Sequence, residues 1–451
     1  MNISIQQFKS ISSVDEFSLD GLTLLAGANS SGKSSIIQAL LLLKQTLEGS
    51  SDDIITLQGD YVNAREFSEL IHNKSQRGAT ISLKWRKEDI VDVYDMSVLM
   101  KYSSLQQIDD VFMSITLKSI DSAITVTDFI LAFESQGKSE RLLLHYNSRS
   151  RLYELTSNLI NVNKWIRSNS DNNNRILIKG CKVDFLNFFP IFISCEDEGL
   201  NEKEFTLLVM KDMRSFVSSF LRNIYYIGPN RVSPALDRFY SSDTISDRVD
   251  STGYNTRYIL AEQKNKIVGD RTLAEEVNFW VKQLGLANEI SANKDNETKL
   301  YKTSVSVSGK LKVDLCNTGF GNSQILPIIV QGLLAPKGSL LIIEDPEVHM
   351  HPAVQSAMTG FFIAMANLGK NIMLETHSDH IVTRIRRRVI EKPKIRKMIH
   401  ICYVEIIEGD SEYITLEMDD RAMFKRYPEL PKGFMDAQDE DFREIIRLKM
   451  E

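Results

Sequence analysis

The sequence of 451 residues predicts an α/β fold built on a parallel β-sheet. An apolar strand at 22–26 leads into a glycine-rich loop, and a helix follows from 36 to 44. Far along the chain, a strand, a helix and a second strand occupy 340–343, 352–366 and 371–374. Both of these later strands are continuous apolar runs, which are typical of parallel strands covered on both faces.

The loop between the first strand and helix reads Gly-Ala-Asn-Ser-Ser-Gly-Lys-Ser over 27–34 and fits the phosphate-loop (Walker A) pattern. In this pattern, backbone N–H groups surround a polyphosphate at the positive end of the helix. Lys33 would reach the β- and γ-phosphates, and the Ser34 hydroxyl would bind Mg²⁺. We therefore predict ATP binding with Mg²⁺, an ordinary Gly/Ser turn being the alternative. The predicted nucleotide-binding residues of this loop are Gly27, Asn29, Ser30, Gly32, Lys33, Ser34 and Ser35.

Polar residues follow the two later strands where each strand ends. Glu344 and Asp345 end the strand at 340–343, and we predict that Glu344 binds the metal while Asp345 orients or deprotonates the attacking water. His377 follows the strand at 371–374 and can hydrogen-bond the γ-phosphate or the attacking water. The alternatives are a solvated acidic turn and a structural histidine.

A second Gly/Ser-rich segment, at 317–324, precedes an apolar stretch at 325–334 that we interpret as a helix despite Pro327. A loop of this kind is another anion-binding helix end. One nucleotide cannot use two such loops within one sheet, so we predict that Gly321 and Ser323 contact the γ-phosphate held by a second protomer. This predicts an ATP-dependent head-to-tail homodimer, and a turn without a ligand is the alternative.

The net charge of −6 and the isoelectric point near 5.8 mean that any contact with DNA must come from a local basic patch. One concentrated basic run is present, and a solvated helix face is the alternative reading of it. Its predicted DNA-contacting residues are Arg384, Arg386, Arg387 and Arg388.

Histidines and cysteines do not form a metal-binding pattern. His349 and His351 have no further His or Cys cluster nearby in sequence, so we predict structural or dimer-contact roles for them. The four cysteines lie far apart, which predicts core thiols in a reducing compartment. They are Cys181, Cys195, Cys316 and Cys402.

The order of the motifs along the chain predicts an insertion between two parts of one ATPase head. Short β-branched stretches between 100 and 200 predict a β-rich part, and helical spacing at 205–224 and 271–287 predicts a helical part. No apolar stretch is long enough to span a membrane, and we expect a cytoplasmic protein. The expected segments are an N-terminal head part at 1–100, the insertion at 101–310 and a C-terminal head part at 311–451.

Together these motifs resemble the ABC-type ATPases of the RecF, chromosome-maintenance and overcoming-lysogenisation-defect group. The segments that carry the resemblance are Phe8 to Ser10, Gly27 to Ser35, Gly319 to Gln324, Glu344 to Pro352 and Glu375 to Arg384. The resemblance implies an ABC-type head in which Ser34 and Glu344 bind Mg²⁺, Asp345 serves the water, Ser323 acts in trans and His377 is the switch. Two features differ from transporter ATPases. The segment at 317–324 is not the transporter signature Leu-Ser-Gly-Gly-Gln, and the acid expected to act on the water is Asp, which is one methylene shorter than Glu. These differences favour slow hydrolysis.

Within this group, the chain length, the insertion and the segment at 430–436 look most similar to stand-alone bacterial defence ATPases, in particular the Septu ATPase subunit. That resemblance implies antiphage immunity together with a separate HNH nuclease. The alternatives are a RecF-like ATPase of DNA repair, a transporter motor and a self-contained nuclease of the overcoming-lysogenisation-defect type. Such a nuclease needs an additional acidic cluster, for which the tail offers only Asp436, Asp439 and Asp441.

Overall fold

The structure is a computed structural model, and contacts divide the chain into two compact units. The first unit comprises Met1–Ser18, Ser34–Asn223 and Ile406–Glu412, and the second comprises Leu19–Lys33, Ile224–Glu405 and Tyr413–Glu451. The organisation expected from the sequence, with head parts at 1–100 and 311–451 and an insertion at 101–310, describes the order of parts along the chain and stays a prediction. The structure describes residues 1–49, 51–90, 97–103, 105–159, 176–195, 202–232, 247–294, 301–308, 311–317, 320–419, 421–425 and 447.

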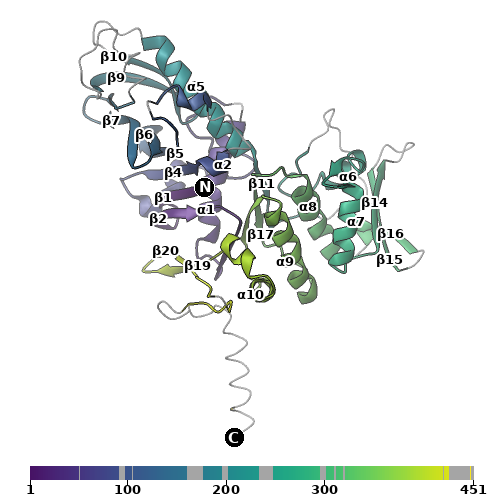
Figure 1. Cartoon of the computed structure of the whole chain (residues 1–451). Helices are drawn as coiled ribbons and strands as arrows, with labels where there is room; N and C mark the ends of the chain where they lie inside the picture. Colours follow the sequence, from purple (N-terminus) through teal and green to yellow (C-terminus); the bar gives the residue numbers. More distant parts are fainter. Residues whose placement is uncertain are drawn as a thin grey trace. The chain divides into compact units, whose positions relative to one another are not determined.

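The first unit is built on a nine-stranded antiparallel sheet in the order β10-β9-β8-β7-β6-β5-β4-β1-β2 (Figure 1). Strands that adjoin along the chain mostly pair with each other, which is the pattern of hairpins joined by tight turns. The predicted β-rich part therefore belongs to the same sheet as the first strands of the chain. The strands are β1 (Asn2–Phe8), β2 (Ile11–Ser18), β4 (Ala79–Arg86), β5 (Asp110–Ile120), β6 (Ala123–Ser135), β7 (Lys138–Asn147), β8 (Leu152–Ser157), β9 (Ile176–Leu186) and β10 (Phe189–Cys195).

Two long helices pack in this unit. Helix α1 (Lys33–Glu48) buries apolar residues on nearly every side, as expected of a helix inside a core. Helix α5 (Glu202–Arg222) packs against β10. The ring of its Phe216 meets the ring of Trp85 edge to face, with the two ring centroids 5.0 Å apart. The shorter helices are α2 (Lys87–Ile90), α3 (Ser97–Met100), η1 (Phe67–Leu70) and η2 (His72–Lys74).

The cysteine prediction is correct for one residue and wrong for another. Cys402 is a buried free thiol, and burial raises its pKa to about 12. Cys181 in β9 is disulfide-bonded, and the antiparallel pairing of β9 with β10 places Cys195 opposite it, which spacing along the chain does not reveal. The side chains of Cys195 and Cys316 are outside the described part of the chain.

The second unit holds the parallel sheet, whose strand order is β11-β17-β18-β3-β19-β20. All pairings from β11 to β19 are parallel. Strand β18 lies between β17 and β3, so residues at the carboxyl ends of these three strands meet at one edge of the sheet. The strands are β3 (Leu22–Gly27), β11 (Ile224–Ile227), β17 (Leu340–Glu344), β18 (Asn371–Glu375), β19 (Ile399–Ile407) and β20 (Asp410–Thr415).

Helices cover this sheet and form one apolar core with it. Gly332 of α8 admits the ring of Phe361 from α9, because an added Cβ at this glycine would lie 2.5 Å from the ring. A small three-stranded sheet and a two-stranded ribbon complete the unit. Its helices are α6 (Thr256–Glu262), α7 (Leu273–Gln283), α8 (Phe320–Leu334), α9 (Pro352–Asn367), α10 (Asp379–Glu391), η3 (Leu315–Asn317) and η4 (Pro393–Met398), and its small strands are β12 (Ile267–Val268), β13 (Arg271–Thr272), β14 (Glu289–Lys294), β15 (Tyr301–Ser308) and β16 (Leu311–Asp314).

The predicted α/β class is confirmed. The strand expected at 22–26 is β3, the helix expected at 36–44 lies within α1, and the strand-helix-strand unit appears as β17, α9 and β18. The helix expected at 325–334 is also present, and α8 accommodates Pro327 in its interior.

Candidate nucleotide site

The loop after β3 has the backbone conformation that a phosphate cradle requires. Gly27 has φ +146, and an added Cβ would lie 2.2 Å from the carbonyl oxygen of Val404 in β19, so no side chain fits there. Ser30 (φ +61) and Gly32 (φ +99) also have positive φ. Left-handed residues in such a loop turn successive N–H groups toward one point and create an anion-binding concavity. Asn29 and Ser30 of this loop are exposed.

Lys33 folds back onto this loop. Its Nζ donates to the carbonyl oxygen of Gly27 at 3.1 Å and to that of Ala28 at 2.7 Å. Burial lowers the pKa of Lys33, while Glu375, Asp345 and Glu347 act in the opposite direction. The ammonium therefore lies in the field of these acids and is held by acceptors that a phosphate can replace.

The two serines after Lys33 belong to the first unit. Ser34 is the second residue of α1, and Ser35 lies beside Ser10, with their Oγ atoms 2.9 Å apart. The division between the units runs between Lys33 and Ser34, so the remaining geometry of the site is that of the second unit.

Glu344 ends β17 as a buried carboxylate. Tyr226 in β11 donates its hydroxyl to Glu344 Oε1 at 3.0 Å. Burial, followed by repulsion from Glu375 and Asp345, raises the pKa of Glu344 to about 7, although the Tyr226 hydrogen bond lowers it. A bound cation would stabilise this accumulation of negative charge at a buried position.

Asp345 has a left-handed backbone, with φ +46, which is uncommon outside glycine and occurs mainly at Asn and Asp. Its N–H donates to the carbonyl oxygen of Glu375 at 2.9 Å, and its own carbonyl oxygen accepts from Arg231 Nη2 at 2.7 Å. Its Oδ1 is buried and has no hydrogen-bond donor. The main chain is therefore fixed while one carboxylate oxygen is left for another partner.

His377 lies between the acids and the phosphate loop. Its Nε2 is 3.8 Å from Asp345 Oδ1, and its backbone N–H donates to Glu347 Oε1. Burial and the charge of Lys33 lower the pKa of His377, while Asp345 and a hydrogen bond with the backbone of Gly27 raise it. The predicted residues Lys33, Asp345 and His377 are thus brought together at one edge of the sheet.

The donor set of this edge fits Mg²⁺ with a polyphosphate. Asp345 Oδ1 and Glu347 Oε2 are buried acceptors without donors, and Glu344 is an acid whose proton a metal would displace. Within the described residues, no group of three or more His, Cys, Asp or Glu side chains could hold a metal by itself. Mg²⁺ commonly takes only one or two carboxylates and completes its shell with phosphate oxygens and water.

The second Gly/Ser segment opens α8, as predicted, although Gly319 lies outside the described residues. Ser323 is buried in the first turn. Gly321 lies close to the loop after β17, since an added Cβ would be 3.4 Å from the carbonyl oxygen of His349. Gln324 donates to the carbonyl oxygen of Arg231 at 3.0 Å, so this helix start is tied to the acidic edge.

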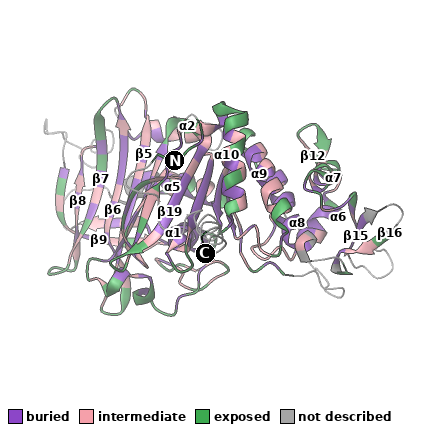
Figure 2. Ribbon diagram, turned by 90° about the horizontal axis from the view of Figure 1, so that it is seen from below, coloured by how far each residue is buried: buried purple, intermediate pink, exposed green. Residues whose placement is uncertain are grey.

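The basic run lies on α10, where Figure 2 shows exposed positions along one side, and much of its charge is already paired. Arg387 and Arg388 both contact Glu391, at 2.8 and 2.7 Å. Arg386 donates to the carbonyl oxygen of Ala422 and lies over the ring of Phe424.

The structure assigns a structural role to one of the two neighbouring histidines. His351 is the N-cap of α9, and its Nδ1 accepts from the N–H of Ala353 at 3.2 Å. This is one of the two roles that the sequence predicts for it.

Three further residues of the site were not predicted. Arg231 and Tyr226 come from β11 and the turn after it, and Tyr413 in β20 donates its hydroxyl to the carbonyl oxygen of Gly32 at 2.6 Å. The segment at 225–231, Tyr-Tyr-Ile-Gly-Pro-Asn-Arg, is a short apolar strand ending in a turn, and the Arg directly after it was the available signal. Tyr413 is distant in sequence from every motif, and no feature of the sequence indicated its role.

Comparisons with known proteins agree with an ATPase fold. Residues 240–382 match the family model described as an AAA ATPase domain, which includes the acids, His377 and the start of α8 and leaves the phosphate loop outside. A comparison with curated proteins gives no significant match. None of the helices in the described residues is long and apolar enough to cross a membrane.

Solved structures that align with most of this chain include three heads of the Smc type. The Smc head bound to the C-winged helix domain of ScpA is 13% identical, covering 94% of this chain and 99% of that chain at a TM-score of 0.47. The Smc head with an extended coiled coil from Pyrococcus furiosus, bound to the C-terminal domain of ScpA, is 11% identical, with coverages of 99% and 98% and a TM-score of 0.46. The SMC head domain from Thermotoga maritima is 10% identical, with coverages of 92% and 98% and a TM-score of 0.39.

Proposed function

We propose that this chain binds and hydrolyses ATP, with the loop Gly27–Ser34 holding the phosphates. The observation that carries the proposal is the meeting of Lys33, Asp345 and His377 at the carboxyl edge of one parallel sheet. This edge, where a phosphate loop adjoins carboxylates of neighbouring strands, is where doubly wound sheets bind nucleotides. The match of residues 240–382 to an AAA ATPase domain supports the same conclusion.

Each residue has a role that follows from its position. Lys33 leaves the carbonyl oxygens of Gly27 and Ala28 and donates to the phosphates. Bound Mg²⁺ would neutralise phosphate charge, and Ser34 and Glu344 would hold it. Asp345 Oδ1, which has no donor of its own, accepts a hydrogen bond or proton from the attacking water. His377, 3.8 Å from that oxygen, contacts the γ-phosphate.

We further propose that ATP brings two copies together head to tail. Gly321 and Ser323 open a helix and would contact the γ-phosphate held by the partner molecule. The hydrogen bond from Gln324 to Arg231 connects this helix to the acidic edge of its own molecule, so the two sites of a dimer would be linked.

The biological role that we propose is antiphage defence, with ATP-driven assembly placing a separate HNH nuclease on DNA. It rests on the resemblance of the motifs to the Septu ATPase subunit. A RecF-like role in DNA repair is the second candidate, because it uses the same ATP-driven pairing. The tail acids Asp436, Asp439 and Asp441, on which a self-contained nuclease would depend, lie outside the described residues.

The test is to purify the chain and measure three activities. Phosphate release from Mg-ATP, light scattering with and without ATP, and cleavage of plasmid DNA by the chain alone report hydrolysis, pairing and nuclease activity. We expect hydrolysis and ATP-dependent dimers without cleavage. Phage challenge of cells that carry the chain with and without its neighbouring genes separates defence from repair, since repair predicts sensitivity to DNA damage instead.

A further inference from the structure

A large cavity lies in the first unit, on a surface that the ATPase chemistry does not use. Its volume is about 1250 Å³, and it is bounded by α5, the end of α1 and β10. Figure 1 shows α5 running beside β10. Leu47, Ile191 and Met210 form its apolar border. This volume exceeds the roughly 300–1,000 Å³ of an ordinary small-molecule pocket.

Helix α5 presents a cationic face to this cavity. Lys211, Arg214 and Arg222 line it together with Ser215, Ser218 and Ser219, and the described lining residues include no acid. These positions are separated by three or four residues, so they share one side of the helix. From Lys211 to Arg222 the row extends about 16 Å.

The described acid of this part of α5, Asp212, is engaged by the residues that follow α3. Asp212 accepts from the hydroxyl of Tyr102 at 2.7 Å and pairs with Lys101 at the same distance. The charge of Asp212 is therefore already paired with Lys101.

Arg214 is fixed in the cavity by a dedicated contact. Its Nη2 donates to Asn187 Oδ1 at 2.6 Å. Asn187 is 2% exposed, has φ +51, and donates through Nδ2 to the carbonyl oxygens of Thr46, at 3.1 Å, and Ser51, at 3.3 Å. A buried amide that anchors an arginine in this way holds the guanidinium in place before a ligand arrives.

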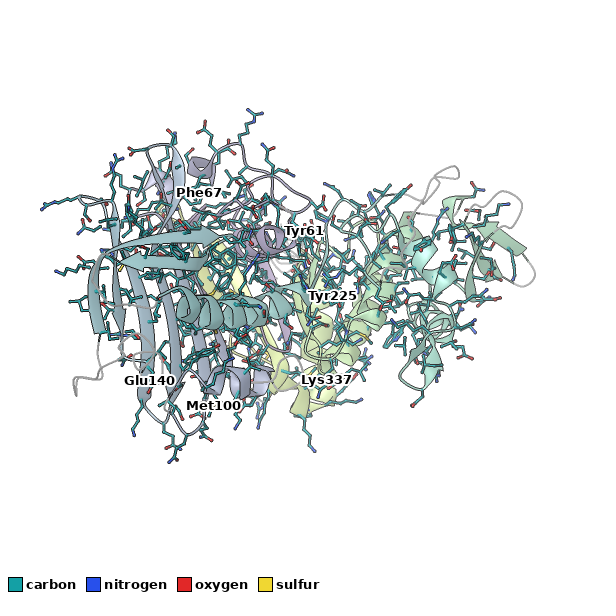
Figure 3. The ribbon with its side chains drawn as sticks, turned by 90° about the horizontal axis from the view of Figure 1, so that it is seen from above. Tyr61, Phe67, Met100, Glu140, Tyr225 and Lys337 are labelled. Atoms are coloured by element: carbon teal, nitrogen blue, oxygen red, sulfur yellow. The ribbon has the colours of Figure 1, made fainter. Side chains whose placement is uncertain are left out.

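The end of α1 borders the same cavity through Leu47. Lys44 is almost completely buried, and its Nζ donates to the carbonyl oxygen of Leu221 at 3.1 Å and to Glu48 at 2.6 Å. Tyr61, labelled in Figure 3, packs beside this helix with its ring 5.7 Å from Lys44 Nζ. The cationic face of α5 is therefore attached to the helix whose first residues follow the phosphate loop.

From these contacts we infer that the α5 cavity binds the sugar–phosphate backbone of a single nucleic-acid strand. A row of cations and hydroxyls about 16 Å long matches several consecutive phosphates better than one compact anion. The described lining residues offer cations and hydroxyls, which are the groups that contact phosphate and sugar. The inference rests on the nucleic-acid part of the proposed function and assigns it to α5 in place of the largely paired run on α10.

The experiment measures fluorescence anisotropy of labelled 30-nucleotide single strands of DNA and of RNA with the full-length chain. The test variant combines Lys211→Gln, Arg214→Gln and Arg222→Gln. The matched control removes the same charge from exposed positions at the turns and strand ends of the nine-stranded sheet, through Lys138→Gln, Arg149→Gln and Arg151→Gln. A milder variant, Lys211→Gln with Arg222→Gln, leaves the Arg214–Asn187 bond intact in case the triple change impairs folding.

We expect at least about tenfold weaker binding by the triple variant, and a smaller slope of affinity against salt by about two, as three lost phosphate contacts predict. The control should bind like the unchanged chain, and the stronger of the DNA and RNA arms identifies the natural strand. Equal affinity of the test and control variants would overturn the assignment to α5. Absence of binding by the unchanged chain would overturn it as well, while ATP binding by the same preparation shows separately whether the nucleotide site stands.

Discussion

Arg231 Nη2 donates to the main-chain carbonyl oxygen of Asp345 at 2.7 Å, and its Nη1 donates to that of Glu344 at 2.9 Å. The arginine thus holds the backbone of both acids in place. Its Nη1 also donates to the carbonyl oxygen of Gly228 at 2.9 Å, which anchors the clamp at the end of β11. The left-handed backbone of Asp345 is maintained by this contact and by its own N–H bond to Glu375.

Replacing Arg231 by methionine should lower the free energy of unfolding by about 3 kcal/mol, since three buried carbonyl oxygens lose a donor. Urea unfolding followed by circular dichroism measures this. ATP turnover should fall more than ATP affinity, because the position of Asp345 is disturbed while the phosphate loop is not. Arg386→Met on α10 is the control, and equal losses of stability in the two variants would contradict the clamp.

Asp345→Asn should reduce ATP hydrolysis by about 10²-fold or more, the usual effect of removing a general base. The amide keeps the size of the side chain, so ATP affinity should change little. Phosphate release and nucleotide titration, measured on the same preparation, separate the two effects. A variant that binds ATP tenfold more weakly but turns it over normally would assign Asp345 to binding instead.

Tyr413→Phe removes the hydrogen bond from the tyrosine hydroxyl to the carbonyl oxygen of Gly32. We expect an ATP affinity lower by about threefold to tenfold, corresponding to roughly 1 kcal/mol for one hydrogen bond. Isothermal titration with Mg-ATP measures it. Tyr254→Phe, in the same unit, serves as the control, and identical affinities in both variants would show that Tyr413 does not support the loop.

The raised pKa of Glu344 predicts a pH dependence of stability in metal-free buffer. The folded chain holds this proton up to a pH of about 7, whereas the ordinary value is 4.5. The stability from this group is therefore complete below about pH 4.5 and is lost as the pH rises through about 7, by on the order of 3 kcal/mol. Melting temperatures with a chelator between pH 5 and 8 should show a smaller decline for Glu344→Gln than for the unchanged chain.

The sequence predicts the local structure correctly where a motif determines its own backbone conformation. The phosphate loop, the strand that ends in Glu344 and the strand before His377 all appear where the sequence predicts them, because continuous apolar runs and glycine positions determine local structure. The neighbourhood of these strands in one sheet also followed from the rule that parallel strands end at the same edge.

What could not be predicted depends on contacts between distant segments. Tyr413 reaches Gly32 across 381 positions, and Arg231 reaches Asp345 across 114. Neither pairing leaves a periodic pattern in the sequence. Likewise, Asn187 looks like an ordinary turn residue until the fold brings Arg214 to it.

Direct nucleotide binding tests our proposal that the loop Gly27–Ser34 holds ATP through Lys33. Titration of the full-length chain and of Lys33→Ala with Mg-ATP should give an affinity at least about tenfold weaker in the variant, as the loss of a charge-assisted contact to phosphate requires. Lys337→Ala, an exchange of another lysine in the same unit, should bind ATP like the unchanged chain. An unaltered affinity in Lys33→Ala, or no ATP binding by the unchanged chain, would contradict the account.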